Sequence, residues 1–203
     1  DKTLPFGNHL SVLAGDSVYS SIEFLNKNAE HENLVKLVRV RSNRTFYGMP
    51  LYSAYPRKKG HPQWYGAPFK LNDPSTHPEP EESKTVPFTF RNGRECEVTI
   101  EAWYDKHMRG KRDIPMHNHP FTLLRVTVKD KNGKEVFKRP MWLILTGKQR
   151  RKISLIDAYD AYRQRFDLEH FFRFGKNRLL MASYQTPETE HEENWWEIAG
   201  LAY

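Results

Sequence analysis

The sequence predicts an α/β protein in which a β-rich segment separates an N-terminal strand–helix–strand unit from C-terminal helices. Two Val- and Leu-rich runs flank a short helical pattern within the first 42 residues. Several Val-, Thr- and aromatic-rich runs follow in the middle of the chain. After Ser154 the apolar residues recur at helical intervals, without proline, to about residue 180. These three patterns together indicate a mixed α/β fold.

The N-terminal unit has the order of a parallel α/β element. "HLSVLAGDS" predicts a strand that ends at Gly15, followed by Asp16 and a turn or helix cap. "SSIEFLNKNAE" has helical spacing, and "NLVKLVRVRS" (Asn33 to Ser42) reads as a strand with alternating basic residues. Because a crossover of this kind joins parallel strands, we expect these two strands to pair in parallel.

The middle of the chain predicts strands and turns. Proline, glycine and aromatic residues between Tyr47 and Pro87 exclude a helix. "CEVTIEAWY", "FTLLRVTVKD" and "EVFKRPMWLILTG" then read as strands, with a hairpin turn at Asn132-Gly133. We therefore expect a β-rich insertion at residues 46–147, between a partial core at 1–45 and a helical segment at 148–203. Pro187 precedes a last acidic helix that contains tryptophan.

Composition sets limits on the function. The net charge of +7 and the pI of about 9.4 favour a polyanionic partner or simply high solubility. The single Cys96 excludes an internal disulfide and fits a reducing, cytoplasmic setting. No apolar run is long enough for a bilayer, and no signal-peptide pattern opens the chain. Both ends look cut, so we expect a fragment of a longer protein.

One helical stretch carries polar residues at regular spacing. In "YRQRFDLEHFFRFGK", Tyr162, Arg165, Glu169 and Lys176 fall within roughly 60° of one another around a helix. The simplest interpretation is an exposed face with an Arg165–Glu169 ion pair, worth a few tenths of a kcal/mol.

The same spacing, Y-x2-R-x3-E-x6-K, resembles the signature of a group of bacterial insertion-sequence DDE transposases. "SVLAGDSVYSSIEFL" and the strand after it resemble the segment of this family that bears the second catalytic aspartate, here Asp16. The resemblance covers nearly the whole chain. It implies an RNase H-like core in which Asp16 and Glu169 hold Mg²⁺ or Mn²⁺, two ions in the intact enzyme.

The resemblance also implies the partners. Such an enzyme cuts DNA at transposon ends and joins the ends to a target, with possible homodimers on paired ends, in the nucleoid-associated cytoplasm of a bacterium. Tyr162, Arg165 and Lys176 would contact DNA phosphates. The first catalytic aspartate of the family has no counterpart here, because only Asp1 precedes Asp16. We therefore expect this chain to be inactive by itself; a non-catalytic DNA-binding remnant is the alternative function.

A basic, aromatic-rich segment supports DNA binding independently. Between Asn33 and Asn72 there is no acidic residue. Cations can follow a phosphate backbone and flat rings can stack on bases, although the rings can equally pack a β-rich core. The basic residues are Lys36, Arg39, Arg41, Arg44, Arg57, Lys58, Lys59 and Lys70, of which Arg39, Arg41 and Arg44 are our DNA-binding candidates. "GKQRRK" (147–152) is a second basic cluster or a solvated turn.

Two further hypotheses concern aromatic and histidine side chains. Some relatives stack a flipped base on an aromatic residue, and Trp64, Trp103 and Trp142 are candidates here, although core packing is the simpler explanation for each of them. His117 and His119, with His107 nearby, could instead be ligands of a metal-dependent β-barrel enzyme. The prolines around them and the absence of a following glutamate argue against this third reading.

Overall fold

The computed structural model describes residues 9–50, 63–90, 92–179 and 188–201. The chain divides into two compact units, Asp1–Tyr159 and Asp160–Tyr203, and each is described by itself. The first unit contains all the strands and the beginning of helix α2. The second contains the rest of α2 and helix α3.

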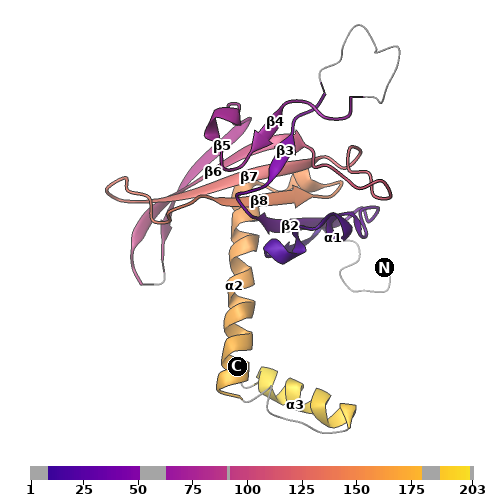
Figure 1. Ribbon diagram of the computed structural model, residues 1–203. Coiled ribbons are helices and arrows are strands. Elements are labelled where there is room, and N and C mark those ends of the chain that lie inside the picture. The colour runs from indigo at the N-terminus through magenta and orange to yellow at the C-terminus, as the bar shows by residue number, and fades with distance from the viewer. Residues whose placement is uncertain (1–8, 51–62, 91, 180–187, 202–203) are drawn as a thin grey trace. The chain divides into compact units, whose positions relative to one another are not determined.

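The first unit is built on one six-stranded sheet (Figure 1). β1 and β2 are parallel, as predicted, and every other neighbouring pair is antiparallel. In spatial order the strands are β1 (Ser11–Gly15), β2 (Leu34–Val40), β8 (Met141–Thr146), β7 (Phe121–Asp130), β6 (Glu95–Lys106) and β5 (Glu82–Thr89).

The strands of the predicted insertion continue the sheet that β1 and β2 begin. β8 pairs with β2, with Val38 opposite Ile144. Only β3 (Thr45–Tyr47) and β4 (Pro68–Lys70) form a separate two-stranded sheet. The mixed α/β class is therefore confirmed, whereas the division into 1–45, 46–147 and 148–203 stays a prediction.

A hydrophobic core covers one face of the sheet. Val38, Ile144, Leu123 and Trp103 are register partners across four strands, and all are almost fully buried. Helix α1 (Ile22–Asn26) follows the 3₁₀ helix η1 (Ser17–Ser20) and adds Leu25 to this core. The small sheet and the segment after β6 contribute Phe46, Phe69, Leu71, Met108 and Met116.

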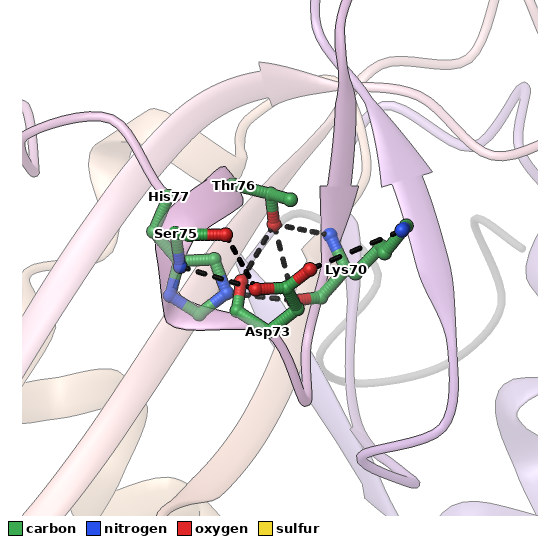
Figure 2. Close-up of polar contacts among 5 residues, drawn as sticks. All are labelled: Lys70, Asp73, Ser75, Thr76 and His77. Carbon is green, nitrogen blue, oxygen red and sulfur yellow. Dashed lines mark hydrogen bonds and ion pairs between the residues drawn. The ribbon is translucent and has the colours of Figure 1, made fainter.

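A tight turn with several polar contacts follows β4 (Figure 2). Asp73 caps the 3₁₀ helix η2 (Pro74–Thr76) by accepting hydrogen bonds from the Ser75 amide and hydroxyl, at 3.3 and 2.6 Å. His77 Nε2 lies 2.7 Å from the Lys70 carbonyl oxygen, and the His77 ring stacks on Phe69 at 4.2 Å. The turn therefore holds His77 against the core.

The helices expected after Ser154 and after Pro187 are both present. α2 spans Leu155–Asn177 and α3 spans Thr189–Leu201. Ser154 caps α2: its hydroxyl accepts from the Asp157 amide at 3.1 Å and donates to the Asp157 carboxylate at 2.6 Å. The first turns of α2 bury Leu155 and Ala158. Among the described helices, none combines the length and apolar character that a membrane span requires.

Candidate functional site

Asp16 lies directly after β1 and caps η1. Its Oδ1 accepts a hydrogen bond from the Val18 amide at 2.8 Å, so the helix cap expected as the simpler role is realised. The side chain is half-buried, and within the described ranges its Oδ2 accepts no hydrogen bond. One carboxylate oxygen is thus used locally while the other remains able to bind a cation.

The parallel pairing places basic residues near Asp16. The carboxyl ends of β1 and β2 lie at the same edge of the sheet, with Gly15 opposite Val38. In open sheets of parallel strands, ligands bind outside the carboxyl ends of the strands, and β1–β2 is the one parallel pair of the described six-stranded sheet. Arg41 directly follows β2, and Arg44 Nη2 lies 3.4 Å from the Ser20 carbonyl oxygen. The structure therefore brings Asp16, Arg41 and Arg44 to one edge.

Some basic side chains of this segment are exposed, and others are held by neighbouring residues. Arg39 and Arg41 are exposed, and neither forms an ion pair in the described part of the chain. Lys70 lies 3.9 Å from Asp73. Lys36 is buried, and its ammonium donates hydrogen bonds to carbonyl oxygens at the end of α1. Three other basic residues of this segment, Arg57, Lys58 and Lys59, lie outside the described residues.

The polar stripe of α2 is exposed only in its later part. Tyr162 is fully buried, whereas Glu169 and Lys176 are exposed. The Arg165 guanidinium donates to Glu169 and lies 5.2 and 4.7 Å from the ring centres of Tyr162 and Phe166. Burial lowers the pKa of Arg165, but interactions with Glu169 and Tyr162 together outweigh it and raise the pKa overall. Tyr162 therefore packs inside the protein, and Arg165 holds the Glu169 carboxylate.

The second basic cluster is held by acidic partners. Arg150 and Arg151 both donate to the Asp105 carboxylate. Lys148 pairs with Glu32 at 3.2 Å. No local sequence motif marks Asp105, so its role was not predictable from the sequence. These contacts make residues 147–152 an anchored connection rather than a free cationic loop.

The three tryptophan candidates separate by burial. Trp103 and Trp142 are 1% and 2% exposed and belong to the core. Trp64 is 41% exposed and stacks on His117, with ring centres 4.4 Å apart and planes at 8°. Of the three, only Trp64 presents an accessible ring.

The histidine metal site, which the sequence offered only as a third possibility, has no ligand set in the described ranges. No three His, Cys, Asp or Glu side chains gather there as a metal site would require. His107 is 3% exposed, and burial lowers its pKa while Asp105 raises it. The His117 ring stacks on the Trp64 ring.

Comparison with known proteins decides the family. A family model described as DDE superfamily endonuclease matches residues 1–110, more than half of the chain. The chain belongs to the DDE superfamily endonucleases. The matched residues include Asp16 and the parallel β1–β2 pair, and they end before α2. No curated protein matches the chain.

Family membership settles the general kind of protein. DDE endonucleases act on DNA and generally use divalent metal ions. The mixed six-stranded sheet with helices is compatible with a nuclease fold of this family. Mg²⁺ prefers oxygen ligands such as carboxylates, and the Asp16 side chain is of that type.

Proposed function

We propose that this DDE endonuclease is part of an insertion-sequence transposase that cuts DNA at transposon ends and joins them to a target, with Asp16 and Glu169 as metal ligands. The family match supports the nuclease chemistry. The Y-x2-R-x3-E-x6-K spacing in α2 supports the assignment to this group and to an RNase H-like core.

The observation that carries the proposal is the edge at which β1 and β2 end. It combines a carboxylate, Asp16, with two arginines, Arg41 and Arg44, that can bind phosphate. Cleavage of a phosphodiester needs both kinds of group, because the metal ligands must lie close to the phosphates they act on. If Asp16 served only as a helix cap, the two nearby arginines would have no role in it.

Each residue has a defined role in this proposal. Divalent ions, when bound, would activate water or a DNA 3′-hydroxyl and neutralise the leaving oxygen. Asp16 and Glu169 would hold the ions, and Arg165 keeps the Glu169 side chain oriented until an ion replaces it. Arg39, Arg41, Arg44 and Lys176 would contact phosphates, and Trp64 would stack on an unpaired base. Tyr162, being buried, would support Arg165 through its ring.

The proposal is tested by the Mn²⁺ affinity of four proteins: the parent, Asp16→Asn, Glu169→Gln and the double variant. Asparagine caps a helix about as well as aspartate, so Asp16→Asn removes the metal ligand while keeping the fold. If the two carboxylates share an ion, the losses in binding free energy will be strongly non-additive. Additive losses, or no loss, would overturn the shared site.

The alternative is a DNA-binding protein without metal chemistry. Two observations favour it: Asp16 already serves as a helix cap, and Glu169 already pairs with Arg165. It predicts that all four proteins bind DNA equally and that Mn²⁺ affinity does not change among them. A salt titration of DNA binding would give the same result for both hypotheses, because both expect the protein to bind DNA phosphates. The Mn²⁺ affinity is therefore the measurement that separates them.

A further inference from the structure

The end of β7 and its connection to β8 carry many exposed cations. Residues 129–139, which we call the cationic tip, contain five basic and two acidic side chains. All five basic side chains are exposed, and none forms an ion pair within the described part of the chain. They are Lys129, Lys131, Lys134, Lys138 and Arg139.

One of the two carboxylates holds the tip in a defined turn. Asp130 Oδ1 accepts hydrogen bonds from the amides of Asn132 and Lys134, both at 3.0 Å, and Oδ2 accepts one from Arg94 at 3.3 Å. These bonds, that of the Lys134 amide first, lower the pKa of Asp130. Gly133, with φ of 77°, donates its amide to the Asp130 carbonyl oxygen at 2.8 Å. The Asp130 charge is therefore used inside the turn, while the lysines around it point their charges to solvent.

The cationic tip lies at the same end of the sheet as Asp16. Since β2 and β8 are antiparallel, with Val40 opposite Trp142, Arg41 follows β2 at the end where β8 begins. β7 pairs with the first residue of β8 at Val126 and continues for four more residues. These four residues extend about 13 Å past the start of β8. The connection between β7 and β8 therefore projects from the end of the sheet that carries Asp16 and Arg41 (Figure 1).

The tip also presents an exposed aromatic ring. Phe137 is 55% exposed, and its ring centre lies 6.4 Å from that of Phe90. An open hollow of about 490 Å³ has Arg94 and Lys131 in its wall, which gives a phosphate group room to approach Lys131. Cations can follow a phosphate backbone, and a flat ring can contact a sugar or an unpaired base. This combination, next to Arg41, fits nucleic acid.

We propose that the cationic tip is a second DNA-binding surface, which contacts the phosphate backbone of the duplex beyond the part held at the β1–β2 edge. The inference rests on the proposed function for its DNA ligand, but it uses neither of the proposed metal ligands. Because both surfaces lie at one end of the sheet, a duplex that contacts Arg41 can continue along the tip. Lysines bind phosphates as point charges, so the tip adds affinity without reading sequence.

The first test maps the surface in the parent protein. Lysines are acetylated with acetic anhydride in the presence and absence of a saturating DNA duplex, and mass spectrometry measures the extent at each position. We expect the duplex to protect Lys131, Lys134 and Lys138, whereas Lys84, exposed on β5, reacts equally in both samples. Equal reaction of the tip lysines with and without DNA would overturn the proposal. Protection by polyglutamate but not by DNA would overturn nucleic acid as the partner.

The second test compares two variants that lose the same charge. One carries Lys131→Gln and Lys134→Gln, and the control carries Lys27→Gln and Lys84→Gln, all at exposed positions. Each phosphate contact contributes about 0.9 to the slope of log K against log salt concentration, so we expect the slope to fall by about 2 in the tip variant. The control should keep the slope of the parent. An unchanged slope in the tip variant would contradict the proposal.

These tests separate the tip from the proposed metal site. If the parent binds DNA but Asp16→Asn and Glu169→Gln leave its Mn²⁺ affinity unchanged, the proposed metal site fails, and lysine protection and the salt slope still decide the role of the tip. If the metal site is upheld and the tip lysines are not protected, only the second surface fails. A parent that binds no DNA would overturn both.

Discussion

Lys36 provides the sharpest test of how β2 and α1 are held together. The residue is 5% exposed, and its ammonium donates to the carbonyl oxygens of Phe24 at 2.8 Å, of Leu25 at 3.0 Å and of Lys27. It therefore satisfies the last carbonyls of α1 from a neighbouring strand. The substitution Lys36→Met keeps a four-atom apolar stem, with sulfur in place of Cδ, and removes the ammonium.

The expected loss follows from these three bonds. A hydrogen bond to a charged group contributes about 1.5–3 kcal/mol, which gives a gross contribution of more than about 4 kcal/mol. The cost of burying the ammonium offsets part of this, and the same burial lowers the pKa of Lys36. We therefore expect Lys36→Met to lower the free energy of unfolding by about 2–3 kcal/mol.

Urea unfolding at pH 7 measures this difference, and hydrogen exchange of the α1 amides reports its location. Lys84→Met on the exposed strand β5 is the control and should stay within about 0.5 kcal/mol of the parent. If Lys36→Met is as stable as the parent, the ammonium does not stabilise α1, and the burial cost of the charge cancels its bonds.

Three further predictions concern pH, backbone conformation and the tryptophans. Burial lowers the pKa of His107 below its ordinary 6.5, so the folded protein loses stability as the pH falls from about 6.5. The substitution His107→Leu should reduce this loss, which melting temperatures measured from pH 7.5 to 5 would show. Gly147→Ala should lower the free energy of unfolding by about 2 kcal/mol or more, because φ is 131° and the new Cβ would lie 2.5 Å from the Leu34 carbonyl oxygen. Gly133→Ala, at φ 77° with open space around it, should lower it by about 1 kcal/mol in the same urea unfolding assay. Trp64→Ala should weaken single-stranded DNA binding by about 1–3 kcal/mol with little change in stability, whereas Trp142→Ala should lower the free energy of unfolding by about 3–5 kcal/mol; equal effects of the two on DNA binding would contradict the assignment.

The local elements were predictable because their signals are local. The parallel pairing of β1 with β2 follows from two apolar runs separated by one short helix, and the cap at Asp16 follows from residue type and position. The β-rich character of the middle was also predictable. The joining of β8 to β2 was not, because a strand pattern does not encode which distant strand it pairs with.

The burial of particular side chains was less accessible to sequence reasoning. Lys36 alternates with apolar residues like a solvent-facing cation, and only the placement of α1 against β2 turns it into a buried cap. Tyr162 shares a helical stripe with Glu169, but spacing defines a side of the helix and not what covers it. The backbone conformation of Asp105 depends on a bulge in β6, and this bulge arises from the register of β6 against β7.

The proposed function depends most on whether Asp16 and Glu169 bind the same metal ion. The direct measurement is anomalous scattering from a crystal of the protein soaked in Mn²⁺. We predict a manganese peak within about 2.0–2.3 Å of a carboxylate oxygen from each of the two residues. A well-diffracting crystal with manganese bound to only one of them, or to neither, would contradict it, and Asp16 would then be a helix cap and Glu169 the partner of Arg165.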